Sequence, residues 1–155
     1  MKPWAALTVL FLSPSQIAAQ DYRASVYGYF TVGACQHSYT VIGGGGGAEG
    51  FLWKGLTLGA EGGFLQFVNG TGYGEAYVPV GYHFGKRQLS AKWDPFVSIA
   101  PLGLYGANGI GPAFHAGGGV TYWFRPKLGI RTEFRVHALG LVETTGQGRI
   151  GITFR

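Results

Sequence analysis

Apolar and polar residues alternate along most of the chain after residue 21, and no 3.6-residue period of the kind found in amphipathic helices appears. Alternation places every second side chain on the same face of an extended strand. Turn-forming residues separate the alternating stretches. The pattern predicts an all-β chain of eight strands, at residues 22–33, 41–52, 56–67, 74–85, 95–106, 112–124, 128–139 and 148–155.

The connections between these strands differ on the two sides of the sheet. Residues 53–55 and 125–127 form three-residue turns, and residues 86–94 form a longer connection on the same side. The connections on the other side are rich in Gly, Asn, Ser and Thr, at residues 34–40, 68–73, 107–111 and 140–147. Sequential strands joined in this way favour an antiparallel up-and-down barrel.

The predicted strand at residues 128–139 has two clearly different faces. One face carries Leu128, Ile130, Thr132, Phe134, Val136 and Ala138, and the other carries Gly129, Arg131, Glu133, Arg135 and His137. Alternation alone does not say which face points outward. A soluble barrel shows its polar face to water, whereas a membrane barrel encloses it.

The number of charges decides between these two arrangements. The charged residues assigned to mid-strand positions number about seven: Arg23, Glu49, Glu61, Arg131, Glu133, Arg135 and Arg149. So few charges cannot solvate the outside of a soluble barrel, but they suit a narrow interior in which opposite signs pair. We therefore predict an eight-stranded transmembrane β-barrel with this lumen charge network. A soluble calycin-like barrel that binds an apolar ligand is the alternative.

Glycine provides space for these charged side chains. If the last hairpin is symmetric about Pro126, Gly119 faces Glu133 and Gly117 faces Arg135. The same construction about the earlier short turn also places a glycine opposite each glutamate of that hairpin. Because an eight-stranded barrel is just wide enough for side chains to fill it, glycines beside large side chains are expected inside.

The composition agrees with a barrel in lipid. The chain contains 29 Gly and only 12% charged residues, against averages of roughly 7% and 25%. Its 15% aromatic content argues against disorder. The net charge is +5, but no basic cluster exceeds Lys86-Arg87, so nucleic acid is not an expected partner. Cys35 is the single cysteine and permits no internal disulfide.

Charge and aromatic residues distinguish the two rims. The short-turn side carries Lys54, Lys86, Arg87, Lys92, Arg125, Lys127 and Arg155, whereas the four longer loops contain no Lys or Arg. Five aromatic residues near the short-turn side are predicted to form an interfacial girdle: Trp53, Trp93, Phe96, Trp123 and Phe124. Short turns of such barrels are periplasmic, and long loops are external.

Two segments resemble small bacterial outer-membrane β-barrel proteins, which have an eight-stranded barrel domain: FHAGGGVTYWFRPKLGIRTEFRVHAL at residues 114–139 and RIGITFR at residues 149–155. The first is similar to the family's penultimate hairpin. The family's last strand ends in an aromatic residue that the barrel-insertion machinery reads. Phe154 matches this position, although Arg155 follows it. The resemblance implies an antiparallel barrel in the Gram-negative outer membrane and supplies no specific activity.

The first twenty residues read as a secretory signal peptide. Lys2 precedes the apolar run Trp4–Leu12, and Ala18-Ala19 supply small residues for cleavage near residues 19–20. The run is shorter than the ~20 apolar residues of a membrane helix. We therefore predict a signal peptide at residues 1–20 and an outer-membrane β-barrel domain at residues 21–155.

Candidate chemistry is sparse. His115 opposes His137 in the predicted register, but two ligands are fewer than a structural zinc site needs, and a polar pair near the loop end is the preferred interpretation. No cofactor is predicted, because Gly43–Gly47 lacks the Lys-Ser/Thr of a phosphate loop. His37-Ser38 and Glu143 lie in external loops, as would residues of a lipid-modifying outer-membrane enzyme.

These observations predict an integral outer-membrane barrel without enzymatic activity, with a lumen plugged by side chains rather than a porin-like ion path. Its role is structural, or it presents its loops for recognition or adhesion. The expected partners are outer-membrane lipid, the barrel-insertion machinery and an extracellular ligand of the loops, and the barrel is expected to be monomeric. The alternatives are a lipid A-modifying hydrolase or acyltransferase and the soluble apolar-ligand binder.

Overall fold

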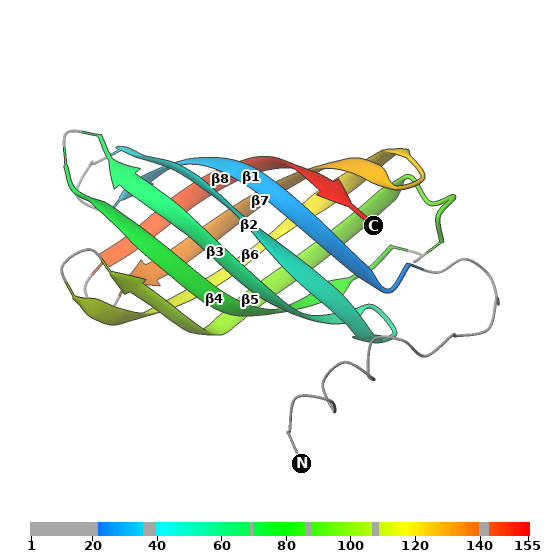
Figure 1. Ribbon diagram of the computed structural model, residues 1–155, viewed down its shortest axis with the longest axis horizontal. Helices are drawn as coiled ribbons and strands as arrows, with labels where there is room; N and C mark the ends of the chain where they lie inside the picture. The colour runs from blue at the N-terminus through cyan, green and yellow to red at the C-terminus, as the bar shows by residue number, and fades with distance from the viewer. Residues whose placement is uncertain (1–21, 36–39, 69, 86–87, 107–108, 140–142) are drawn as a thin grey trace, which may run out of the picture.

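The computed structural model describes residues 22–35, 40–68, 70–85, 88–106, 109–139 and 143–155. They form one closed barrel in which every neighbouring pair of strands is antiparallel (Figure 1). The strands are β1 (Ala24–Cys35), β2 (Thr40–Trp53), β3 (Leu56–Phe67), β4 (Gly72–His83), β5 (Trp93–Gly106), β6 (Ile110–Arg125), β7 (Leu128–Leu139) and β8 (Glu143–Phe154). The predicted eight-stranded barrel is confirmed. No helix within these ranges is long and apolar enough to span a membrane.

The strand ends differ from the predicted bounds at several places. β3 and β7 match, but β8 begins at Glu143 rather than at residue 148, because its ladder with β7 continues to the pair Leu139↔Glu143. Residues 143–147 lack apolar alternation, yet backbone hydrogen bonds form whatever the side chains are. The predicted signal peptide at residues 1–20 and its cleavage site lie outside the described residues.

The two shortest connections are turns of two residues rather than three. Lys54 and Gly55 join β2 to β3 with φ angles of 40° and 94°. Positive φ at both positions is typical of a type I′ turn, whose twist matches that of the flanking strands. Pro126 and Lys127 join β6 to β7. Such tight turns fix the register of each hairpin.

The predicted register is confirmed in both hairpins. Gly119 pairs with Glu133 and Gly117 with Arg135 between β6 and β7. Between β2 and β3, Glu61 pairs with Gly47. Each of these charged side chains therefore has a glycine beside it on the neighbouring strand.

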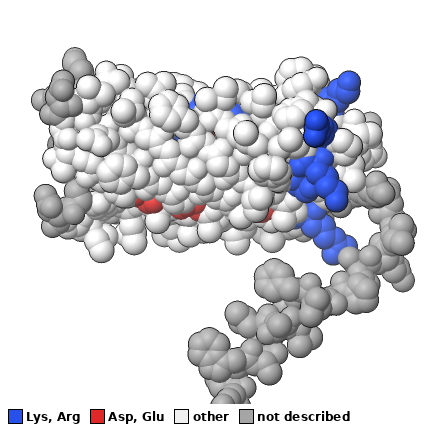
Figure 2. All heavy atoms as spheres, turned by 45° about the horizontal axis from the view of Figure 1, so that its top comes forward, with Lys and Arg blue, Asp and Glu red and all other residues white. Residues whose placement is uncertain are grey.

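Apolar and charged side chains are divided between the outer and inner faces of the sheet as a membrane barrel requires. In β7, Phe134 is 60% exposed on the outside, while Arg135 is 1% exposed and lies inside. Figure 2 shows an outer wall with little charge along most of its length and a band of Lys and Arg at one end. The soluble alternative needs the polar face on the outside, and this arrangement does not fit it.

The packed core of the protein lies in the barrel interior. Towards the end with the longer loops it is an apolar and tyrosine cluster, made of Val41, Leu65, Tyr73, Tyr77, Ala100 and Ala113. Farther towards the short turns the interior is filled by charged and polar side chains. The interior thus consists of an apolar layer near the loops and a charged layer in the middle.

Candidate functional site

Six of the seven residues predicted for the lumen charge network are buried in the barrel interior: Glu49, Glu61, Arg131, Glu133, Arg135 and Arg149. Arg23 is exposed and precedes β1, so its predicted place in the lumen is wrong. The Arg23 carbonyl still accepts a backbone hydrogen bond from Phe51 of β2, at 2.8 Å. At this last position before β1, however, the arginine side chain is exposed rather than enclosed by the barrel.

Glu61 in β3 is the centre of the charged layer. Arg135 in β7 donates to its two carboxylate oxygens from Nη1 and Nη2, at 2.6 and 2.7 Å. Arg149 in β8 donates to the same carboxylate at 2.6 Å, and Tyr27 and Tyr29 donate at 2.7 and 3.3 Å. Buried charges are tolerated when they are paired and hydrogen-bonded. The Glu61 carboxylate meets both conditions.

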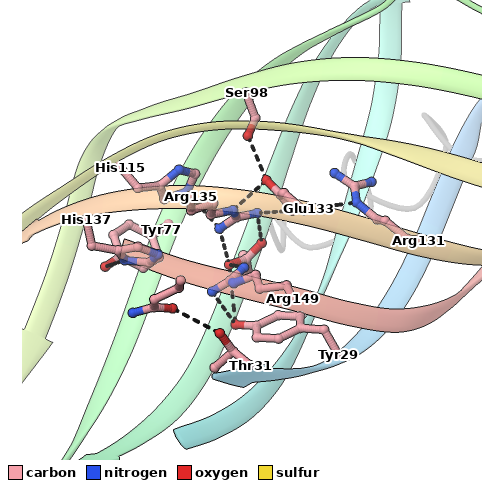
Figure 3. A network of polar contacts seen from close by, with 12 residues as sticks. Tyr29, Thr31, Tyr77, Ser98, His115, Arg131, Glu133, Arg135, His137 and Arg149 are labelled. Atoms are coloured by element: carbon pink, nitrogen blue, oxygen red, sulfur yellow. Dashed lines mark hydrogen bonds and ion pairs between the residues drawn. The ribbon is translucent and has the colours of Figure 1, made fainter. Parts of the chain in front are cut away.

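Glu133 forms a second centre next to the first (Figure 3). Arg135 reaches it through Nε and Nη2, and Ser98 of β5 donates to it at 3.0 Å. The Arg131 Nε lies 3.8 Å from the other carboxylate oxygen. Arg135 therefore bridges Glu61 and Glu133, so that a single guanidinium joins β7 to β3.

Glu75 of β4 belongs to the network although it was not predicted. Arg149 Nη2 lies 3.1 Å from its carboxylate, and Tyr77 donates to it at 3.2 Å. The Arg149 guanidinium also lies over the Tyr29 ring, 3.9 Å from the ring centre. The inward position of Glu75 could have been predicted from the sequence, because Glu75 and Tyr77 are two positions apart and therefore lie on the same face of their strand.

A chain of polar contacts continues from this layer to the short-turn end. Arg131 donates to Glu49 at 2.7 Å. His83 lies between two carboxylates, 3.3 Å from Glu49 and 2.8 Å from Asp94. Tyr22 donates to Asp94 at 2.7 Å. Burial and the neighbouring Asp94 carboxylate raise the pKa of the Tyr22 phenol, which therefore remains a neutral donor.

The predicted aromatic girdle is only partly on the outside. Three of its five members are exposed: Trp53, Trp93 and Phe124. Phe96 and Trp123 are 3% and 4% exposed, so their placement in the girdle is wrong. Both occupy inward-facing positions of their strands, and the Arg131 guanidinium lies 3.8 Å from the centre of the Phe96 ring. These two rings close the barrel interior near the short turns.

The histidine pair lies inside the barrel on the loop side of the charges. His115 and His137 are neighbours in the ladder, and their ring centres are 5.4 Å apart. Tyr77 lies 3.0 Å from His137 Nδ1, and Arg135 Nη1 lies 3.0 Å from His115 Nε2. The Arg135 cation beside the pair disfavours a bound metal ion. Within the described ranges, no cluster of three or more His, Cys, Asp or Glu could hold one.

Glycine is required where the charged side chains are largest. A Cβ at Gly119 would lie 2.8 Å from the Glu133 Cα and 3.0 Å from the Phe96 ring. A Cβ at Gly117 would lie 2.6 Å from the Arg135 Cγ. Real Cβ atoms do not approach other atoms this closely. The glycines therefore provide the volume that the network occupies.

The charged layer leaves little free volume between its side chains. A cavity of about 10 Å³ is lined by Tyr27, Tyr29, Arg131, Glu133 and Arg149, together with two glycines. This is about the volume that one water molecule requires. The arrangement can hold strands together across the interior, because its ion pairs join β7 and β8 to β3.

The comparison with solved structures agrees with the barrel architecture, whereas the two sequence comparisons find no match: no protein-family model matches the chain, and no curated protein matches its sequence. The N-terminal β-barrel domain of Pseudomonas aeruginosa OprF is similar in structure, with 19% identity, a TM-score of 0.60, and coverage of 84% of this chain and 96% of that one. Neisserial surface protein A is 10% identical, with a TM-score of 0.65 and coverage of 84% and 94%. The chain has the fold of the eight-stranded outer-membrane β-barrels.

A third similar structure is that of Ail, the attachment invasion locus protein of Yersinia pestis, in complex with the heparin analogue sucrose octasulfate. It is 8% identical, with a TM-score of 0.57 and coverage of 87% of this chain and 99% of that one. At these identities the likeness concerns the fold alone.

Of the remaining sequence candidates, the structure places Cys35 and Phe154, each at the end of a strand. His37 and Ser38 of the enzyme hypothesis lie outside the described residues, as does the side chain of Glu143. Cys35 ends β1 as a buried free thiol. Phe154 ends β8 on the outside, where it pairs with Val26 and Leu128.

Proposed function

We propose that this outer-membrane barrel is an integral, non-enzymatic protein of the Gram-negative outer membrane whose lumen is plugged by its own side chains. The observation that supports a plug is the Glu61 carboxylate, which binds arginines from two other strands. Because those arginines are themselves paired, no charge of the layer is left to attract a passing ion. The role that follows is structural occupancy of the membrane.

A two-part experiment tests this proposal. Protein extracted from membranes with detergent should migrate differently on gels with and without heating, as closed barrels do, and the same preparation should produce no steady conductance in planar bilayers. Steady ion currents from a heat-modifiable preparation would contradict the plug. A protein found in the soluble fraction would contradict membrane integration.

Several further expectations belong to the same proposal. Residues 1–20 serve as a cleaved signal peptide, and the outward Phe154 side chain serves as the signal for the barrel-insertion machinery. The barrel contacts membrane lipid with its apolar face and acts as a monomer. Replacing Phe154 with Ser should reduce the yield of inserted barrel, while replacing it with Tyr should preserve that yield.

Loop-mediated recognition is the second candidate role, since four connections meet at one end of the barrel. The similar Ail structure holds a sulfated heparin analogue. The four longer loops of this chain contain no Lys or Arg, so we do not propose a polyanion as their ligand. Binding of cells carrying the wild-type barrel to neutral glycan or protein surfaces, compared with a variant with shortened loops, tests this role.

The enzyme alternative has its own test. Lipid A from a strain that expresses the protein should be identical to that from a deletion strain if the protein is not a hydrolase or acyltransferase. A difference in the lipid profile that disappears in His37→Ala or Ser38→Ala would replace the structural proposal.

A further inference from the structure

Basic side chains form a ring around the short-turn end of the barrel. We define the basic collar as the exposed residues Arg23, Lys54, Lys92, Arg125 and Lys127. Arg23 precedes β1, Lys54 lies in the β2–β3 turn, and Lys92 precedes β5. Arg125 ends β6, and Lys127 lies in the β6–β7 turn. Because neighbouring strands follow each other around the barrel, these positions are distributed over its circumference. On the face shown in Figure 2, Lys and Arg side chains gather in a band at one end.

Among the described residues, no acidic side chain forms an ion pair with a collar residue. Every ion pair among the described residues joins two groups of the barrel interior. Asp94, which lies near the collar, is 2% exposed and is bound by His83 and Tyr22. The collar therefore presents positive charge to its surroundings.

Exposed tryptophans fix the depth of the collar relative to a bilayer. Trp53 and Trp93 are 66% and 61% exposed, and each is adjacent in sequence to a collar lysine. The Lys54 ammonium lies 4.7 Å from the centre of the Trp53 ring. Tryptophan on a membrane protein is enriched at the level of the lipid headgroups. Collar charges beside these rings therefore lie where phosphate groups are.

We propose that the basic collar binds the headgroups of anionic phospholipids in the leaflet at the short-turn end. A ring of separate charges matches a planar anionic surface that surrounds the barrel. A protein partner or a compact anion would instead require the charges on one side. The loop end carries no Lys or Arg in its connections, so the asymmetry also gives the barrel one preferred orientation towards anionic lipid. This inference rests on the barrel spanning a membrane.

Tryptophan fluorescence tests the proposal at the collar itself. The protein is reconstituted in mixtures of phosphatidylglycerol and phosphatidylcholine in which one lipid has acyl chains brominated near the headgroup. Quenching then reports which lipid contacts Trp53 and Trp93. We expect phosphatidylglycerol to be preferred roughly fivefold or more, a preference that falls as salt is added.

Two variants with the same four positions changed provide the comparison. Lys54→Asn, Lys92→Gln, Arg125→Gln and Lys127→Gln together should bring the preference close to one, because four of the five collar charges are removed. Lys54→Arg, Lys92→Arg, Arg125→Lys and Lys127→Arg should retain it. Heat-modifiable migration of each variant separates a failure of insertion, which would contradict the proposed membrane function, from a failure of this inference.

Two results would overturn the inference. One is equal quenching by both lipids for an inserted wild-type barrel. The other is the same preference in the neutral and the charge-retaining variants, which would assign selection to other residues. If the inserted wild type shows no lipid preference but sediments together with isolated cell wall, in a way that depends on the collar charges, the partner of the collar is the cell wall. In that case the lipid proposal is wrong.

Discussion

Glu61 and Arg135 are 74 positions apart in the chain and form a two-pronged ion pair across the barrel interior, at 2.6 and 2.7 Å. Glu61→Ala should lower the free energy of unfolding by about 3–5 kcal/mol, because it leaves buried guanidinium groups without their acceptor. Urea unfolding of the barrel in lipid vesicles measures this. Lys127→Ala, at an exposed position, is the matched control and should change stability by less than about 0.5 kcal/mol. Similar stability of the two variants would refute the network's structural role.

A methyl group added next to the network should also destabilise the barrel. Gly119→Ala places a Cβ against the Glu133 backbone and the Phe96 ring, and we expect a loss of about 1–3 kcal/mol from overpacking. A Cβ at Gly50 meets no atom within 4 Å, so Gly50→Ala should be nearly neutral. The two unfolding curves should therefore separate clearly. A Gly119→Ala barrel as stable as Gly50→Ala would mean that the interior has spare room there.

The β2–β3 turn depends on glycine at one position. Gly55 has a φ of 94°, and a Cβ there would contact the His83 carbonyl oxygen. Gly55→Ala should cost about 1–3 kcal/mol of backbone strain, whereas Lys54→Asn should be tolerated because asparagine adopts positive φ more readily than lysine. Refolding yield into vesicles and the unfolding midpoint both report this difference. Equal behaviour of the two variants would argue against the type I′ geometry.

The interior is closed by two layers in series, and this leads to a prediction on conductance. The double variant Glu61→Ala and Arg135→Ala removes the centre of the charged layer, but the apolar cluster near the loops still covers that end. We therefore expect no steady current from this variant in planar bilayers. Adding Leu65→Ala opens the apolar layer at a fully buried position, and the triple variant should therefore produce a steady current. A current from the double variant alone would show that charge pairing is the only barrier.

The Tyr22 hydroxyl ties the segment before β1 to the barrel interior through Asp94. Tyr22→Phe should lower stability by about 1 kcal/mol, the value of a typical hydrogen bond, since the ring itself retains its packing against Phe51. Tyr22→Ala should cost more because the ring is also lost. Thermal unfolding followed by gel migration compares them. An unchanged Tyr22→Phe midpoint would mean that water replaces the hydroxyl without loss.

Alternation along the chain predicted the strands and their pairing within each short hairpin, and the small number of charges predicted the inward direction of Arg131, Glu133 and Arg135. Alternation failed just before β1, where the Arg23 side chain is exposed although its backbone still bonds to β2. The prediction that Phe96 and Trp123 lie on the outside was wrong because it followed their aromatic character rather than their inward-facing positions in the strands.

Contacts across the interior could not be predicted in the same way. A turn fixes which residues of adjacent strands face each other, but Glu61 in β3 meets Arg135 in β7 only through the tilt and stagger of the whole barrel. Tilt and stagger depend on all strands together. No local pattern in either strand encodes them.

The pairing of β1 with β8 has a consequence for the order of folding. Residues from Val26 to Cys35 hydrogen-bond with residues from Thr145 to Phe154, so one edge of β1 has no partner until β8 has been translocated. An open edge of this kind in a bilayer leaves backbone groups without hydrogen bonds. The barrel therefore cannot be completed strand by strand as the chain emerges. The edge of β1 stays open until β8 pairs with it, so the first and the last strand finish the barrel together.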